Sequence, residues 1–257
     1  MKLGFLGIGR IATSVIKGLC TSEIKNITIA VSPRNETSSV ALENAFPEVS
    51  RMESNQQVLD NSEIVFIALP PASAKNILSE LNFRSTHKVV SFIPFLKHEE
   101  LSELVSPAIE ISRAIPLPTV EKHNCPIPVF NADLTILKIL ESLGEPLPVE
   151  SETELHTLWT LTGLIAPFYD LCETLSNWTQ AKGIKPTTAN TYIMDLFWSL
   201  SAPLKGKEMP GFGALKEEAT TPNGMNEQAL KIITEEKAHT AYQKASDVLL
   251  ERFNKKL

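Results

Sequence analysis

Apolar and polar residues alternate along the first 150 residues in a pattern that predicts short strands separated by helices. The predicted strands are nearly continuous apolar runs, whereas the segments between them carry apolar residues at helical spacing. Strands that are apolar on both faces are typical of a parallel sheet with helices on each side. The predicted strands span 2–7, 27–31, 63–69 and 88–93, with weaker candidates at 109–113, 128–130 and 144–150, and the predicted helices span 11–20, 37–45, 56–60, 73–81 and 133–143.

The pattern changes near residue 150 and is helical almost to the end of the chain. The range 153–182 is predicted to be one long helix that Pro167 kinks or breaks. Further helices are predicted over 186–200 and 226–255, and the segment 201–224, which is rich in proline and glycine, is predicted to be a loop. The sequence therefore predicts a doubly wound α/β domain over 1–150 and an all-helical domain over 151–257.

The first predicted strand runs into G-I-G-R-I-A at residues 7–12, a Gly-x-Gly-x-x-Ala sequence before a predicted helix. In this context Gly7 permits a tight turn, Gly9 lets the backbone approach a pyrophosphate, and Ala12 lets the helix pack closely on the strand. The helix N-terminus offers unpaired N–H groups and a positive dipole end to phosphate oxygens. We therefore predict a Rossmann-type domain that binds a dinucleotide; a tight turn that binds nothing is the alternative.

The residues after the second predicted strand favour NADP over NAD. NAD-binding chains place Asp or Glu there, about 20 residues past the glycines, to hold the ribose 2′-hydroxyl. No carboxylate lies between Ile27 and Asn35, and Ser32, Arg34 and Asn35 instead offer a hydroxyl, a guanidinium group and an amide to a 2′-phosphate. We expect NADP(H) as the cofactor; an incidental arginine in a surface turn is the alternative.

Composition narrows the class of protein and the kind of site. The formal net charge is −6 and the isoelectric point about 5.5, so the field of the chain repels nucleic acid and anionic lipid. No apolar run approaches the ~20 residues of a membrane span, and the chain starts directly on an apolar strand, so we expect a cytoplasmic protein without a membrane partner. Three cysteines and five histidines without metal-ligand spacing predict that there is no metal site.

Four stretches of the chain resemble one known family. They are LGFLGIGRIATSVIKGL, VSPRN, NQQVLDNSEIVFIALPP and SRAIPLP. Together they resemble the pyrroline-5-carboxylate reductase family, whose Asn, Asp, Ala and Pro positions are approximately matched by Asn55, Asp60, Ala68 and Pro70 or Pro71. The resemblance covers the N-terminal domain well and the helical domain more loosely.

The resemblance implies hydride transfer from NAD(P)H to a cyclic imine. It also implies that the helical domain forms a homodimer, with the active site between the two domains of the dimer. Trp159, Trp178 and Trp198 are expected in that interface. The expected cofactor-binding residues are Gly7, Gly9, Arg10, Ile11, Ala12, Ser32, Arg34, Asn35, Asn55, Ala68, Leu69 and Pro70.

The departures from the family lie at its substrate and nicotinamide end. The Ala-Ala-Gly that follows the strand at 88–93 in the family is Ile93-Pro94-Phe95 here, and the Asn of its Met-Pro-Asn stretch is Leu117. Its Gly-Ser-Gly-Pro-Ala-Tyr at the start of the helical domain becomes G-L-I-A-P-F-Y at 163–169. The cofactor end is thus kept, whereas the substrate end is altered.

A second altered stretch carries the predicted substrate residues. The family's Ser-Pro-Gly-Gly-Thr-Thr becomes T-P-N-G-M-N at 221–226, so its last Thr, which bonds the ring nitrogen of the substrate, falls on Asn226. An amide still donates a hydrogen bond, and an asparagine in place of glycine tolerates a left-handed conformation. The expected catalytic residues are Asn226 and Thr221, and the expected substrate-binding residues are Asn223, Gly224, Met225 and Asn226.

Three functional classes stay open at this point. The first is an NADPH-dependent reductase of pyrroline-5-carboxylate, in proline biosynthesis, or of a related cyclic imine. The second is an NADP-dependent oxidoreductase of the β-hydroxyacid dehydrogenase type. Such enzymes carry a catalytic lysine early in the helical domain, whereas here the first lysine after Gly163 is Lys182, about 20 residues or ~30 Å along a straight helix. The third is a non-catalytic, NADP-binding regulatory paralogue.

Overall fold

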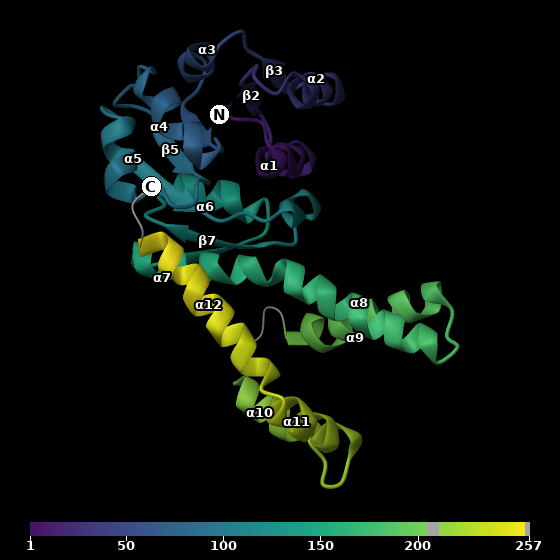
Figure 1. Ribbon diagram of the computed structural model, residues 1–257. Helices are drawn as coiled ribbons and strands as arrows, with labels where there is room; N and C mark the ends of the chain where they lie inside the picture. The colour runs from purple at the N-terminus through teal and green to yellow at the C-terminus, as the bar shows by residue number, and fades with distance from the viewer. Residues whose placement is uncertain (205–210, 255–257) are drawn as a thin grey trace. The chain divides into compact units, whose positions relative to one another are not determined.

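The computed structural model describes residues 1–204 and 211–254, which group into two compact units (Figure 1). The first unit contains Met1–Trp159 and the described residues from Arg252 onward, and the second contains Thr160–Glu251. The division falls inside the helix α7 (Glu152–Leu161). The domain boundary predicted at residue 150 lies directly after the last strand of the sheet. As a boundary between functional domains it stays a prediction.

One eight-stranded sheet forms the centre of the first unit, in the order β3-β2-β1-β4-β5-β6-β7-β8. Neighbouring strands pair in parallel except for β6 and β7, which are antiparallel. The strands are β1 (Lys2–Leu6), β2 (Thr28–Val31), β3 (Val49–Arg51), β4 (Ile64–Ile67), β5 (Lys88–Ser91), β6 (Glu110–Ala114), β7 (Pro126–Phe130) and β8 (Glu145–Val149). The predicted fold class is therefore confirmed.

Two details of the sheet differ from the prediction. The short strand β3 was not predicted, because its three residues include only one apolar side chain. The pairing of β6 with β7 is antiparallel because the connection between them, residues 115–125, contains only the 3-10 helix η1 (Pro118–Lys122). Parallel neighbours need a longer crossover, which is usually an α-helix.

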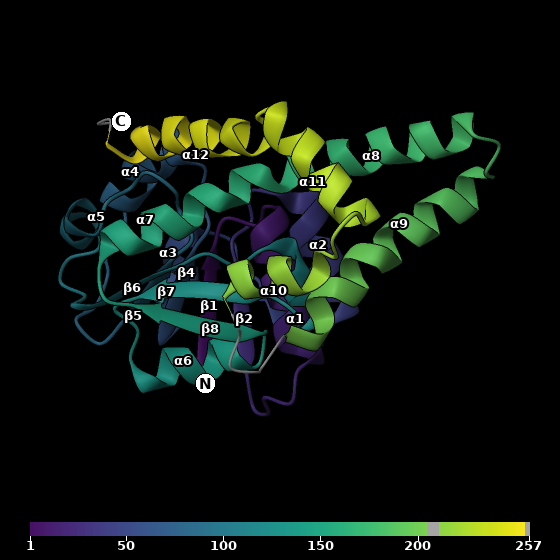
Figure 2. The same ribbon diagram turned by 90° about the horizontal axis from the view of Figure 1, so that it is seen from below.

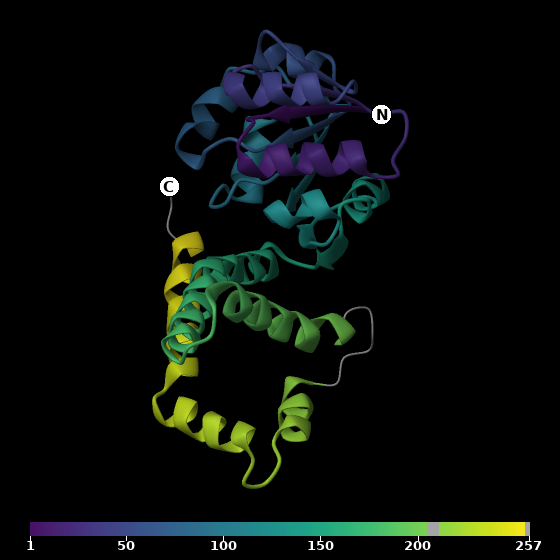
Figure 3. The same cartoon turned by 90° about the vertical axis from the view of Figure 1, so that its right-hand side faces the viewer.

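Helices cover both faces of the sheet (Figure 1), and Figure 3 looks onto one of these faces, with its purple helices in front. One face packs against α1 (Arg10–Thr21), α2 (Glu36–Ala45) and α6 (Leu134–Glu141), and the other against α3 (Asn55–Asp60), α4 (Pro71–Ser79) and α5 (His98–Leu104). Successive residues of a strand point to opposite faces, so Phe5 and Phe66 stack at 4.7 Å on one side while Leu6 and Ile67 are buried on the other. This arrangement explains why the central strands are apolar throughout.

The second unit is helical, with no strand among its described residues. Within it α8 and α9 form an antiparallel hairpin (Figure 2). The elements after α7 are η2 (Thr162–Leu164), α8 (Ile165–Ala181), α9 (Pro186–Ser201), η3 (Ala202–Leu204), α10 (Phe212–Ala219), α11 (Met225–Glu235) and α12 (Ala238–Asn254). In the ranges that the structure describes, no helix is both long and apolar enough to span a bilayer.

The helical boundaries confirm the predicted break at Pro167 and correct two other predictions. The helix predicted over 153–182 is broken by η2, because the ring of Pro167 clashes with the carbonyl four residues earlier and the proline fits the first turn of α8 instead. The helix predicted over 226–255 is two helices, separated at Lys237, whose φ is 57°; residue 255 lies outside the described part. The segment predicted as a loop over 201–224 contains α10, and its residues 205–210 are not described.

Candidate functional site

The turn between β1 and α1 contains two glycines, and a different structural reason favours glycine at each position. Gly7 has a φ of +91°, and a Cβ built there would lie 2.7 Å from the carbonyl oxygen of Ala68. A side chain at Gly7 is therefore excluded by the protein itself. A Cβ built on Gly9 would meet nothing within 4 Å, so the protein leaves the space above Gly9 open. This space is a cradle that any side chain at Gly9 would fill.

Gly9 is also the N-cap of α1, and it makes no side-chain capping bond. The first helical bond in this turn runs from Thr13 N to Gly9 O at 3.0 Å. The preceding backbone N–H groups of Arg10, Ile11 and Ala12 therefore have no partner inside the helix, as at every helix start. Their side chains do not line the cavity described below: Arg10 is exposed, Ile11 packs against the core, and Ala12 is fully buried.

The loop after β2 is tied to this turn by two side chains. Ser32, which is 1% exposed, accepts a hydrogen bond at its Oγ from Gly7 N at 2.9 Å. The Nδ2 of Asn35 donates to Ile8 O at 2.6 Å, while its Oδ1 accepts from Ser38 N at 3.4 Å and caps α2. The two loops therefore form one unit at the carboxyl edge of the sheet.

Arg34 differs from its neighbours because its side chain is exposed. Among the described residues it makes no hydrogen bond and no ion pair. The nearest carboxylate in sequence, Glu36, begins α2 and lies 3.7 Å from Arg51 Nη2. Arg51 also donates to Pro33 O at 3.4 Å. A guanidinium group without a partner thus remains at the end of β2.

These elements enclose a cavity of about 310 Å³ at the carboxyl ends of β1, β2 and β4. Ligands of open α/β sheets bind at this edge, where the strand order reverses between β1 and β4. Nine predicted cofactor residues line it: Gly7, Gly9, Ser32, Arg34, Asn35, Asn55, Ala68, Leu69 and Pro70. Sequence reasoning missed Ile8 and Ser73, the latter being the third residue of α4 and without any motif signal.

The residues present fit the phosphates of a dinucleotide. The open space above Gly9 and the unpaired N–H groups of α1 suit a pyrophosphate, and Arg34 suits a further phosphate. Among the described residues that line the cavity there is no carboxylate, histidine or cysteine. No group of metal-ligating side chains large enough to hold an ion occurs within the described ranges.

The predicted substrate loop lies in the second unit. Gly224 N donates to Thr221 O at 2.9 Å, and Asn223 adopts the left-handed conformation with a φ of 60°. Asn223 N donates to Glu227 at 2.7 Å, and Asn226 Nδ2 donates to Ala219 O at 2.9 Å. The loop is thus an ordered turn that Gly224 joins to α11, with Met225 88% exposed. The catalytic and substrate-binding roles of these residues stay predictions.

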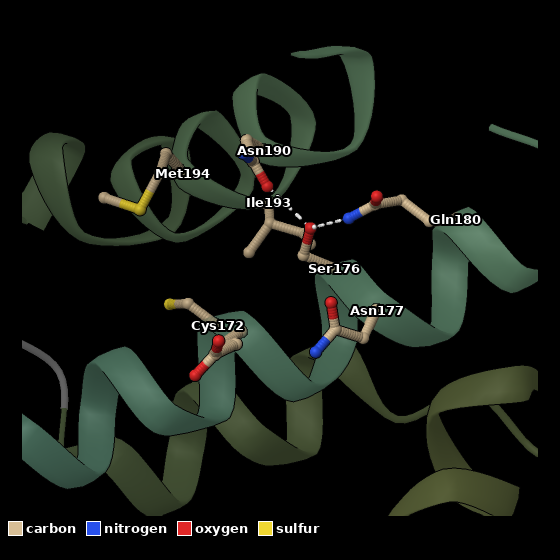
Figure 4. A pocket seen from close by; sticks show the side chains of 8 residues that line it. Cys172, Ser176, Asn177, Gln180, Asn190, Ile193 and Met194 are labelled. Atoms are coloured by element: carbon tan, nitrogen blue, oxygen red, sulfur yellow. Dashed lines mark hydrogen bonds between the residues drawn. The ribbon is translucent and has the colours of Figure 1, made fainter. Parts of the chain in front are cut away.

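A larger cavity of about 460 Å³ lies between α8 and α9 (Figure 4). Its polar groups satisfy one another: Ser176 Oγ donates to Asn190 Oδ1 at 2.6 Å, and Gln180 Nε2 donates to Ser176 Oγ at 2.9 Å. Cys172 and Met194 lie at the other end of the cavity. None of the predicted site residues lines it.

A buried polar cluster lies where β5 and β6 end, and sequence reasoning gave it no role. Arg113 is 0% exposed, forms an ion pair with Glu152, donates to Ile93 O at 3.0 Å and lies 2.8 Å from His156 Nε2. Burial, followed by the charge of Arg113, lowers the pKa of His156 to about 4. His156 is therefore neutral at physiological pH and accepts from Arg113. The only sequence signal was the SRAIPLP stretch, which contains Arg113.

Two family models match different parts of the chain. The model described as "NADP oxidoreductase coenzyme F420-dependent" matches residues 2–94, and that described as "Pyrroline-5-carboxylate reductase dimerisation" matches residues 152–256. The chain is 24% identical over 268 residues to a pyrroline-5-carboxylate reductase from Escherichia coli (strain K12), covering 99% of this chain and 97% of that protein.

Solved structures share the fold. A pyrroline carboxylate reductase from Plasmodium falciparum, with NADP bound, has a TM-score of 0.84 at 17% identity and covers 98% of this chain and 97% of its own. A reductive aminase from Aspergillus terreus, in complex with NADPH and ethyl levulinate, has a TM-score of 0.61 at 14% identity and covers 79% of this chain and 74% of its own. The sequence matches along both halves and the shared fold lead to one assignment: the chain is a divergent member of the pyrroline-5-carboxylate reductase family of NADP-binding oxidoreductases.

Proposed function

We propose that this chain uses NADPH to reduce a cyclic imine, either pyrroline-5-carboxylate in proline biosynthesis or a related compound. The observation that carries the proposal is the cavity at the switch point of the sheet. It combines an open glycine turn with an unpaired arginine and with no carboxylate at the end of β2. Membership of the reductase family supplies the reaction class.

In this proposal the first unit binds the cofactor. Gly9 and the N-terminus of α1 hold the pyrophosphate, because the backbone there is open and its N–H groups are free of helical partners. Arg34 receives the 2′-phosphate, because its charge is permanent and no described group pairs with it. Asn55 offers its amide from the first turn of α3.

NADPH, when bound, supplies a hydride to the carbon of the C=N bond. The protein's part is to orient the substrate and to exclude water. One N–H of the Asn226 amide donates to Ala219 O, and among the described residues the other has no partner and can donate to a substrate. We assign Asn226 and Thr221 to the reacting end of the substrate, and Asn223, Gly224 and Met225 to the rest of it.

We also propose that two copies of the chain pair through the second unit. Its helices expose large aromatic and aliphatic side chains that a monomer would leave in water. Trp178 is 64% exposed, Tyr192 68%, Trp198 60% and Leu200 64%. The dimerisation model that matches residues 152–256 supports this interface.

The test is to follow NADPH oxidation by its near-ultraviolet absorbance with pyrroline-5-carboxylate, and then with its six-membered and uncarboxylated analogues. The proposal expects turnover with at least one of these imines and a clear preference for NADPH over NADH. An Arg34→Ala variant should lose that preference and retain turnover with NADH. NADPH binding without turnover on any imine would refute the imine reductase assignment and favour a regulatory paralogue. Equal use of NADH by the unmodified chain would refute the role of Arg34.

A further inference from the structure

Phe95 has a backbone conformation that large side chains rarely adopt. Its φ is 66°, in the left-handed region, where a bulky residue is a true outlier. Apart from glycine, the other described residues with positive φ are polar: Asn26, His123, Asn131, Asn223 and Lys237. Side-chain sterics alone disfavour this conformation by about tenfold for a non-glycine residue. Surrounding contacts must therefore hold Phe95 in place.

Those contacts come from the last turn of α12. The ring of Phe95 lies 4.8 Å from that of Phe253, and the guanidinium carbon of Arg252 lies 4.9 Å from the Phe95 ring centre. Phe253 is only 6% exposed and is itself fixed, since it stacks on His156 at 4.5 Å and lies 5.9 Å from Trp159. The end of the chain thus holds the outlier through a packed aromatic cluster in the first unit.

The segment that Phe95 belongs to begins just after β5. Its other side is also fixed, because the buried Arg113 donates to Ile93 O at 3.0 Å. β5 pairs in parallel with β4, and the residues that follow β4 line the cofactor cavity. The segment 93–96, which follows β5, therefore lies at the same edge of the sheet. In a Rossmann-type sheet this is the second mononucleotide-binding half, beyond the switch point.

The left-handed turn also leaves donors unused. Within the described part of the chain, neither the Phe95 nor the Leu96 backbone N–H has a hydrogen-bond partner. A left-handed residue turns successive N–H groups toward one side, where they can bind an anion or a carbonyl oxygen. If Phe95 relaxed to an ordinary conformation, these donors would change direction.

We propose that Phe253 is a positioning residue, which acts through Phe95 to hold the segment 93–96 in the conformation that binds the nicotinamide half of the cofactor. The inference rests on the proposed binding of NADPH and extends it, because it assigns a role in the cofactor site to the last turn of α12. Phe253 itself need not touch the cofactor.

A double-mutant cycle tests whether Phe253 affects NADPH binding through Phe95. Phe253→Ala should weaken NADPH binding about tenfold, as the left-handed conformation loses its support. Phe95→Gly should remove the dependence on Phe253, because glycine adopts positive φ without help. Adding Phe253→Ala to Phe95→Gly should then change the affinity by no more than about twofold. Multiplication of the two single effects in the double variant would overturn the proposal.

Binding of 2′,5′-ADP, which lacks the nicotinamide half, is the internal control. Phe253→Ala should leave its affinity unchanged, and an equal loss for both ligands would overturn the proposal by showing general damage. Failure of the unmodified chain to bind either ligand would instead refute the proposed cofactor. Phe83→Ala is the matched control variant, since Phe83 is 5% exposed and contacts His87 in the connection between α4 and β5. Phe253→Leu keeps most of the buried volume if Phe253→Ala does not fold, and should show a smaller loss in the same direction.

Discussion

Protonation of His156 should destabilise the first unit. His156 is 8% exposed, and its Nε2 lies 2.8 Å from Arg113 Nη1, from which only the neutral ring accepts a hydrogen bond. Glu152 offers partial compensation at 3.9 Å, while Lys97 adds further positive charge. The pKa of His156 is lowered to about 4 by burial and then by Arg113. In the unfolded chain the same group titrates near pH 6.5.

The size of the loss in the free energy of unfolding follows from this difference in pKa. Because the folded pKa lies below the unfolded one, the unfolded chain binds the proton first, and stability falls as the pH falls. The loss begins below about pH 6.5 and ends near pH 4, where the folded protein also binds the proton. A shift from about 6.5 to about 4 corresponds to about 2 kcal/mol lost near pH 5 and about 3 kcal/mol near pH 4, relative to pH 7.

The His156→Gln variant isolates the contribution of His156 to the pH dependence of stability, because glutamine keeps a neutral acceptor beside Arg113 and does not titrate. Urea unfolding followed by circular dichroism, at several pH values from neutral to about pH 4, gives the free energy of unfolding of each protein. The unmodified chain should lose about 3 kcal/mol more than the variant over that range. Parallel losses in the two proteins would refute the argument, since carboxylates elsewhere act equally on both.

Four further changes test the site and the interface. Gly9→Ala should fold normally, because its Cβ would meet nothing within 4 Å, yet bind NADPH at least about tenfold more weakly in a fluorescence titration. Gly7→Ala should instead lower the free energy of unfolding by about 1–3 kcal/mol, because φ is +91° and its Cβ would lie 2.7 Å from a carbonyl oxygen; an unchanged urea midpoint would contradict this. Arg34→Ala should raise the KM for NADPH by about tenfold or more while leaving that for NADH unchanged. Trp178→Glu, at a side chain that is 64% exposed, should reduce the mass measured by light scattering to that of a monomer.

Much of the fold could be predicted because its signals are local. Strands buried on both faces, such as β1 and β4, read as apolar runs, and the glycine turn follows directly from β1. Pro167 indicated a break in the long helix, although the break falls in the turn before it. The missed elements lacked such signals. β3 has three residues with one apolar side chain, and α10 lies in a segment dominated by proline and glycine.

The cluster around Arg113 could not be predicted because it joins residues that are distant in sequence. Arg113 lies near the end of β6, His156 lies on α7, and Phe253 lies near the end of α12. Neither periodicity nor spacing relates these positions. The resemblance placed a glycine of the family at Phe95 and thus suggested an altered turn there. The structure keeps the left-handed backbone that glycine favours, with a φ of 66°, while the residue itself is large.

The end of β2 shows how a motif identifies residue types without showing how their atoms are used. Ser32, Arg34 and Asn35 appeared equivalent as phosphate ligands in the sequence. In the structure Ser32 Oγ accepts from Gly7 N at 2.9 Å, and Asn35 Nδ2 donates to Ile8 O at 2.6 Å. Both side chains therefore join the two loops, and the amide of Asn35 has little capacity left for a ligand. The proposed discrimination between NADPH and NADH then rests on Arg34, and we expect its replacement to change cofactor preference rather than stability.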